Sequence, residues 1–278
     1  MADVLNHPLL AARYFFPGGE PPSHRVDVEV EGATLVCAHH PAPGPEFARE
    51  ERAGEYPPGP EFAREERAGE YRGTQPTVVF FHGNGETAGA WQGLLESAFH
   101  QLGWGLFLAE YRGYGGSTGE PLLGKMLDDV AAVVGAAGEP ESLVVMGRSV
   151  GSIFALEAVR RFPSIGGLIL ESGIADAMER ILLRVRPQEI GASREEFEAA
   201  EARLDHEAKM RGYAGPSLIL HTRHDGIVDV RHGQLLHQWA GDSRLRIFES
   251  GDHNSIMWEN SAEYWAEIAD FLSRLTSG

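Results

Sequence analysis

The sequence has one cysteine, few basic residues and no long apolar run, and each shortage excludes a class of protein. Cys37 is the only cysteine among the 278 residues, so it cannot form an intrachain disulfide and nothing here requires an oxidising compartment. Because Cys37 stands in an apolar stretch, we expect a small buried side chain rather than a nucleophile.

Basic residues are outnumbered by acidic ones, with 24 Lys and Arg against 41 Asp and Glu and a formal net charge of −17. Nucleic acids and anionic membranes attract basic surfaces and repel acidic ones. We therefore expect neither of them as a partner of this protein.

No stretch of the sequence approaches the roughly 20 apolar residues that cross a bilayer, so no membrane span is expected. The first residues carry no basic segment, and the apolar residues 9–12 end at Arg13, before the core of a signal peptide could form. These absences predict a cytoplasmic protein.

Residues 41–76 lose the apolar periodicity seen elsewhere and contain an internal duplication. Residues 43–56 recur without change as residues 58–71. Two copies do not make a solenoid, which needs at least about three stacked repeats, and long loops add little closure entropy. We interpret this segment as a duplicated surface loop insertion; a docking arm for a partner is the alternative.

The rest of the chain alternates between strand and helix patterns. Residues 25–30 and 34–38 flank a turn at Glu31 and Gly32, which predicts an antiparallel hairpin at the start of the fold. Buried strands of the parallel kind are predicted at 77–81, 106–109, 143–146, 167–170, 217–220 and 245–248. Helices are predicted at about 87–102, 125–137 and 257–275, and another begins just after Ser149 and continues through at least Leu156. The alternation predicts a single α/β domain over 1–278, with a mostly parallel central sheet flanked by helices.

Residues 174–215 separate two of the predicted strands and are charged and helical in pattern. Met178 and Ile181 belong to one apolar stripe, and residues 195–209 read as a polar helix. An insertion at this point of the fold would sit above the carboxyl ends of the strands. We therefore expect a small helical lid within the domain.

Ser149 stands at a sharp break between a predicted strand and a predicted helix. Gly147 and Gly151 bracket it, which indicates a strained turn where a larger residue at either glycine would collide with the adjoining strand or helix. The turn pushes the serine hydroxyl outward. The backbone N–H of Val150, at the start of the helix, is then available to stabilise a developing oxyanion.

A serine nucleophile needs a general base, and that base needs an acid to orient it. Asp225 and His253 each follow a predicted parallel strand, so both should lie on the same edge of the sheet as Ser149. Two other carboxylates compete for the acid role: Glu171, at the end of an earlier strand, and Asp229.

Five short motifs in this order resemble those of the α/β-hydrolases, in particular the small serine hydrolases and serine-aminopeptidase-like members. They are HGN at 82–84, YRGYG at 111–115, GRSxG at 147–151, HxxxDxxV at 221–228 and HN at 253–254. The likeness covers about residues 77–272. It implies the α/β-hydrolase fold and a triad of Ser149, His253 and Asp225. It also implies an oxyanion hole made by the backbone N–H groups of Asn84 and Val150.

The expected activity is hydrolysis of an ester, thioester or amide of a small acyl substrate through an acyl-enzyme. This chemistry needs no cofactor, and no residues with zinc-binding spacing predict a metal site. A non-catalytic binding module on the same fold is one alternative. Aminopeptidase or perhydrolase chemistry on the same triad is another. An aminopeptidase would require a carboxylate in the pocket, whereas the acidic residues of 195–201 read as a solvated helix face.

Overall fold

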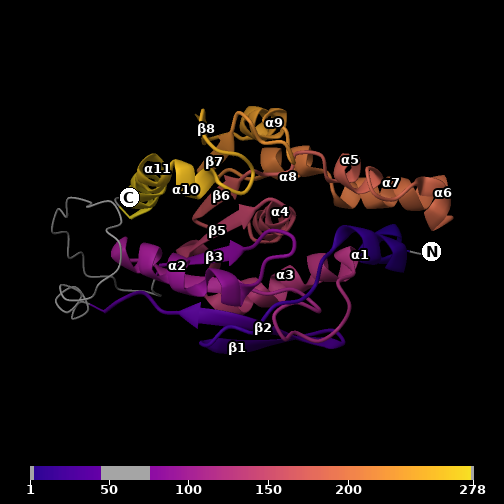
Figure 1. Cartoon of the computed structure of the whole chain (residues 1–278), viewed down its shortest axis with the longest axis horizontal. Coiled ribbons are helices and arrows are strands. Elements are labelled where there is room, and N and C mark those ends of the chain that lie inside the picture. The colour runs from indigo at the N-terminus through magenta and orange to yellow at the C-terminus, as the bar shows by residue number, and fades with distance from the viewer. Residues whose placement is uncertain (1–2, 45–75, 277–278) are drawn as a thin grey trace.

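The computed structural model of the chain describes residues 3–44 and 76–276 (Figure 1). Except at its ends, the predicted surface loop of residues 41–76 lies outside the described residues.

An eight-stranded sheet forms the centre of the molecule, in the order β1-β2-β4-β3-β5-β6-β7-β8 (Figure 1). Strands β3 to β8 pair in parallel, whereas β1 and β2 form an antiparallel hairpin whose second strand joins β4. The predicted α/β architecture with an amino-terminal hairpin is therefore confirmed. The strands are β1 (Arg25–Val30), β2 (Ala33–His40), β3 (Thr77–Phe81), β4 (Gly105–Ala109), β5 (Leu143–Arg148), β6 (Gly167–Glu171), β7 (Ser217–Thr222) and β8 (Ser243–Phe248).

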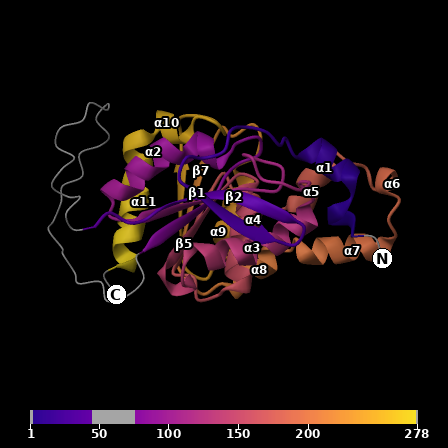
Figure 2. The same cartoon turned by 90° about the horizontal axis from the view of Figure 1, so that it is seen from below.

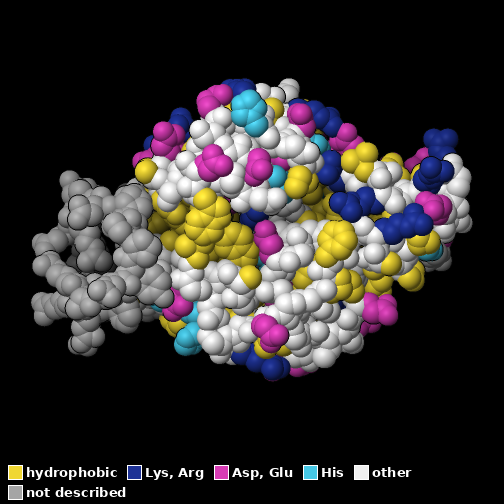
Figure 3. Space-filling model, viewed as in Figure 1, with side chains coloured by type: hydrophobic (Ala, Val, Ile, Leu, Met, Phe, Trp, Pro, Cys, Tyr) yellow, Lys and Arg dark blue, Asp and Glu magenta, His cyan; other side chains and the backbone are white. Residues whose placement is uncertain are grey.

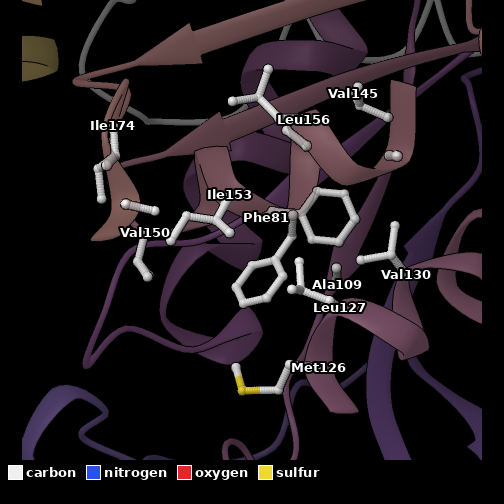
Figure 4. Packing of buried hydrophobic residues seen from close by; sticks show 14 of the residues in the cluster. Phe81, Ala109, Met126, Leu127, Val130, Val145, Val150, Ile153, Leu156 and Ile174 are labelled. Carbon is white, nitrogen blue, oxygen red and sulfur yellow. The ribbon is translucent and has the colours of Figure 1, made fainter. Parts of the chain in front are cut away.

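Helices cover both faces of the sheet, because successive strand residues point to opposite sides. In β3, Val79 and Phe81 belong to the core cluster under α3 (Leu123–Ala137), α4 (Gly151–Arg161) and α9 (Arg231–Trp239). Val78 and Phe80 belong to the cluster under α2 (Ala88–Gln101), α10 (Ile256–Glu259) and α11 (Ser261–Leu275). Figure 4 shows Phe81, Leu127 and Ile153 converging in the first cluster. This packing holds α4, the helix that follows Ser149, against the sheet.

Two predicted helices are each broken into two. The polar helix expected over 195–209 is α7 (Arg194–Arg203) and α8 (His206–Gly212), because Asp205 accepts a hydrogen bond from the N–H of Ala208 and starts a new helix. The closing helix expected over 257–275 is broken between α10 and α11. There the Asn260 side chain donates to the carbonyls of Ser250 and Ile256.

Four helical segments carry no expectation from the sequence: η1 (Val4–Asn6), α1 (Pro8–Tyr14), η4 (Pro140–Ser142) and α9. All are short, so an apolar period has little length in which to show. The first two are started by side chains, since Asp3 accepts from the N–H of Leu5 and His7 from that of Leu9.

The span 174–215, expected as a lid, contains α5 (Ala177–Leu182), α6 (Pro187–Ile190), α7 and α8. Figures 1 and 2 both place α1 near α5, α6 and α7 at one end of the molecule. Two ion pairs join the segments: Arg13 reaches Glu189 at 2.9 Å, and Arg203 reaches Asp3 at 3.5 Å. The amino-terminal segment and the insertion are therefore held together at this end of the molecule.

Two of the three shortages noted in the sequence can be compared with the structure. Cys37 is fully buried in β2, and burial raises the pKa of its thiol to about 12, which confirms the expected inert apolar role. Within residues 3–44 and 76–276, no helix has the length and apolar character required to cross a membrane.

Candidate active site

Ser149 occupies the tight turn between β5 and α4, and its backbone lies in the left-handed region with φ of 51°. An L residue is rarely found there, which marks the turn as strained. A Cβ added at Gly151 would stand 1.9 Å from the carbonyl oxygen of Phe81, and one at Gly147 would stand 2.7 Å from that of Gly151. Both glycines are required by close backbone approach, as the sequence predicts.

Ser149, His253 and Asp225 form a continuous hydrogen-bonded chain. His253 Nε2 lies 2.9 Å from Ser149 Oγ, and His253 Nδ1 lies 2.7 Å from Asp225 Oδ2. The three residues follow β5, β8 and β7 respectively, so the parallel sheet brings them to one edge. The imidazole can thus accept the serine proton at one nitrogen while the carboxylate orients the other.

The carboxylate of Asp225 is buried and held by its own loop. Its Oδ1 accepts hydrogen bonds from the N–H groups of Ile227 at 2.9 Å and Val228 at 2.7 Å. Burial acts to raise the pKa of Asp225, but the hydrogen bond and charge of His253 and these two N–H groups hold that pKa below its usual range. The group is therefore ionised at neutral pH and fixed in direction.

The two competing acids lie elsewhere. Glu171 is buried with Arg148, at 3.4 Å, and accepts a hydrogen bond from the hydroxyl of Tyr264. Asp229 is exposed and accepts from the N–H of Arg231 at 2.9 Å. Neither contacts His253, which leaves Asp225 as its carboxylate partner.

Val150 and Asn84 border the same cavity as Ser149. Among the described residues, no acceptor is bonded to the backbone N–H of either one. The side chain of Asn84 is turned away: its oxygen accepts from the hydroxyl of Tyr114 at 3.0 Å and the N–H of Phe16 at 3.2 Å. Of Asn84, only the backbone N–H is thus available to a ligand in the cavity.

The cavity above Ser149 has a volume of about 270 Å³. Its walls come from the turn after β3, the turn after β5, the loops after β7 and β8, the amino-terminal segment and α5. They include Tyr14, Phe16, Asn84, Arg148, Val150, Ile174, Arg180, Arg184, Ile227, Val228 and His253. A concave site that combines apolar and polar side chains beside a hydrogen-bonded serine suits a small organic substrate.

Comparison with known proteins shows which proteins the chain is similar to. The sequence profile of the family described as "Serine aminopeptidase, S33" matches residues 73–190. The chain is 24% identical over 204 residues to YfhR of Escherichia coli and, over the same length, 24% identical to human alpha/beta hydrolase domain-containing protein 17B. The chain has the α/β-hydrolase fold and is similar in sequence to members of the α/β-hydrolase superfamily.

These alignments cover 70% of this chain and 69% of YfhR, and 71% of this chain and 66% of the human protein. The chain therefore spans about two thirds of the length of the curated relatives it matches.

Solved structures share the fold. Est1E of Butyrivibrio proteoclasticus, solved with ferulic acid bound, aligns with a TM-score of 0.66 at 16% identity, covering 91% of this chain and 100% of that one. The Pyrococcus furiosus esterase Pf2001 aligns with a TM-score of 0.64 at 14% identity, covering 94% and 98%.

A buried polar network supports the turn that carries Asn84. His82 Nε2 lies 2.7 Å from Glu110 Oε1, and His82 Nδ1 lies 2.8 Å from the carbonyl of Gly83. Tyr111 donates to the carbonyl of His82 at 2.8 Å. Both ring nitrogens of His82 are thus engaged in supporting the loop, and neither of them contacts Ser149.

Sequence reasoning assigned no role to Arg148 and Glu86, which adjoin the site. Arg148, the residue between Gly147 and Ser149, is buried and pairs with Glu86 at 3.2 Å as well as with Glu171. Glu86 also accepts from the N–H of Gly83 at 2.7 Å. The pair therefore ties the turn after β3 to the turn that carries the serine. An arginine inside the GRSxG motif was the available signal.

The amino-terminal segment was also missed. Tyr14 and Phe16 line the cavity, and the carbonyl of Tyr14 accepts from the side-chain amide of Asn84. The N–H of Phe16 donates to the hydroxyl of Tyr114 at 2.9 Å. No pattern in the sequence brings residues 14–16 to the site, because this placement depends on contacts between distant parts of the chain.

One group of described residues has ligand atoms close enough together to hold a metal ion: His24, His40 and Glu96. His40 pairs with Leu106, near the amino end of β4, whereas Ser149 follows the carboxyl end of β5. This group therefore lies near the amino ends of the parallel strands, opposite to Ser149, and does not belong to the candidate active site.

The strained backbone at Ser149 makes a stability prediction. We expect Ser149→Gly to be more stable than Ser149→Ala by about 1 kcal/mol, because glycine adopts positive φ without a Cβ penalty. Chemical denaturation of the two variants measures the difference. The same two substitutions at Ser152, within α4, should give the opposite order, with Ser152→Ala more stable than Ser152→Gly. A more stable alanine at position 149 would contradict the assigned strain.

Proposed function

We propose that this protein cleaves an ester, thioester or amide through an acyl-enzyme. Ser149 Oγ attacks the substrate carbonyl while its proton passes to His253 Nε2. Asp225 holds the imidazole in the required tautomer and stabilises the imidazolium that forms. His253 then gives the proton to the leaving group, and an activated water releases the acid from Ser149 by the reverse path.

The observation that carries the proposal is the continuous chain from Ser149 to His253 to Asp225, with distances of 2.9 and 2.7 Å, at the edge of a cavity. The N–H groups of Asn84 and Val150 border the same cavity and would stabilise the tetrahedral oxyanion. The catalytic groups of these steps are side chains and backbone groups of this chain, and the second reactant is water. The α5 end of the insertion at 174–215 would shape the acyl pocket as a lid.

Aminopeptidase chemistry is the second candidate, favoured by the matching family's description. A free amino terminus carries a positive charge and would need an available carboxylate. Among the described residues that line the cavity, Glu86 is the one carboxylate. It is already engaged by Arg148, by the N–H of Gly83 and by the indole of Trp91 at 2.9 Å. The charges of the cavity therefore favour ester or thioester cleavage.

Labelling with a fluorophosphonate probe tests the proposal directly. We expect one probe per chain on the wild-type protein and none on Ser149→Ala, because only an activated serine attacks the phosphorus. Ser255→Ala is the matched control, since this serine is on the loop of His253 but bonds to Asp252. Failure to label folded wild-type protein would favour the binding module.

The class of scissile bond is tested separately. p-Nitrophenyl esters of increasing chain length are compared with aminoacyl nitroanilides by kcat/KM. We expect turnover in the ester series, with an optimum set by the cavity. A steep optimum among the nitroanilides, with little ester turnover, would assign an aminopeptidase instead.

A further inference from the structure

Two arginines of the insertion border the cavity that contains Ser149. Arg180 belongs to α5, and Arg184 stands two residues beyond the end of that helix; both side chains line the cavity. Arg180 is partly buried, and the guanidinium of Arg184 lies 5.6 Å from the ring centre of Phe16. Basic side chains gather at the α5–α6 end of the molecule in Figure 3.

Neither arginine has an ion-pair partner within residues 3–44 and 76–276. The carboxylates nearest in the chain are engaged elsewhere. Glu179 pairs with Arg231 and stands 3.6 Å from His232. Glu189 pairs with Arg13 at 2.9 Å.

The remaining acidic groups nearby do not neutralise the two arginines either. Asp176 accepts from the N–H of Glu179 at 2.8 Å and caps α5. Burial raises the pKa of Tyr14 to about 12, against the opposing charges of Arg180 and Arg184, so its hydroxyl is neutral at pH 7. The positive charge at this wall of the cavity is therefore uncompensated.

Apolar side chains also line this cavity. Phe16, Ile174, Ile227 and Val228 border it together with the two arginines and Ser149. A substrate held at Ser149 would thus have both hydrocarbon and guanidinium groups within the same cavity. That combination suits an acyl group that carries an anion.

We propose that Arg180 and Arg184 bind an anionic group, a carboxylate or a phosphate, at the end of the substrate remote from the scissile bond. This inference rests on the proposed function, because it assigns a substrate class to the same site. Guanidinium groups match both anions through charge-assisted, paired hydrogen bonds. In a protein of net charge −17, only a local pair of cations can make the pocket attractive to an anion.

The test compares charged and neutral substrates of equal length. The p-nitrophenyl monoesters of dicarboxylic acids from adipic to sebacic are measured beside their ω-methyl esters. We expect the best charged ester to exceed its neutral partner in kcat/KM by at least about 10-fold, mainly through KM, and the ratio to fall with added NaCl. An ω-phosphate ester distinguishes the two anions.

The variant Arg180→Gln/Arg184→Gln should bring the charged-to-neutral ratio of kcat/KM to about 1, because both esters then meet uncharged side chains at this wall. Arg194→Gln is the matched control, because this arginine lies on α7 and pairs with Glu198 at 2.6 Å. A wild-type ratio at or below 1, or a ratio unchanged in the double variant, would overturn the proposal.

A binding measurement separates this inference from the proposed catalysis. Calorimetry with suberate on Ser149→Ala reports the anion site without any turnover. Binding that is lost in Ser149→Ala/Arg180→Gln/Arg184→Gln supports the anion site even if no ester is cleaved. Ester cleavage by the wild type without suberate binding supports the hydrolase and overturns the anion site.

Discussion

Replacing Asp225 by asparagine should lower kcat by up to about 10⁴-fold while the protein stays folded. An amide next to His253 Nδ1 favours the wrong imidazole tautomer and cannot stabilise the imidazolium. The loop should persist, because the side-chain oxygen can still accept from the N–H groups of Ile227 and Val228. Steady-state kinetics on a p-nitrophenyl ester, with circular dichroism for folding, measures both effects.

Two control variants make this prediction specific. Asp229→Asn should retain near-normal kcat, because this carboxylate is exposed and bonds only its own helix start. Glu171→Gln should retain kcat within about 10-fold but lower the free energy of unfolding, since it removes one of the two carboxylates of buried Arg148. A severe loss in Glu171→Gln, with near-normal rates in Asp225→Asn, would move the orienting acid one strand earlier.

The largest effect on stability is expected at Glu157, on α4. This buried carboxylate pairs with buried Lys209 of α8 at 3.0 Å and with Arg160 and Arg161 at 2.7 Å. Glu157→Gln should lower the free energy of unfolding at pH 7 by roughly 3 kcal/mol, because it leaves the Lys209 ammonium buried without its counter-charge. Urea denaturation measures the change. Glu198→Gln, at an exposed pair on α7, should cost less than about 1 kcal/mol.

The same residue predicts a pH dependence. Burial by itself raises the pKa of Glu157, but hydrogen bonds from Arg160, Arg161 and Lys209 and the charge of Lys209 lower it to about 2. A carboxylate whose pKa is lowered by folding stabilises the fold above its unfolded pKa and loses that contribution as pH falls through the folded pKa. The difference between wild type and Glu157→Gln should therefore shrink from about pH 4.5 toward pH 2. A difference that does not change over this range would contradict the assigned interaction.

Much of the candidate site could be predicted from the sequence because its members are tied to strand ends. Ser149, Asp225 and His253 each follow an apolar run, and parallel strands carry their carboxyl ends to one edge. Gly147 and Gly151 could be interpreted for a similar reason, since the backbone approach they permit is between adjacent elements. These inferences need only local pattern and the handedness of strand–helix–strand units.

The choice among Asp225, Glu171 and Asp229 required the tertiary structure. All three stand at or just beyond a strand end, so periodicity cannot separate them; the direction of each side chain does. The helix breaks at Asp205 and Asn260 could not be predicted from the sequence for another reason. No glycine or proline marks either position, and side-chain hydrogen bonds to the backbone decide where each helix ends.

Only the tertiary structure brings residues 14–16 and α5 to the cavity. Arg180 and Arg184 look in the sequence like two solvated charges of a polar insertion. The structure instead makes them candidate binding residues, because Phe16, Ile227 and the turn of Ser149 line the same cavity. Periodicity reports which face of an element is apolar, but contacts between segments more than a hundred residues apart depend on how the whole chain packs, and that packing determines what the site can bind.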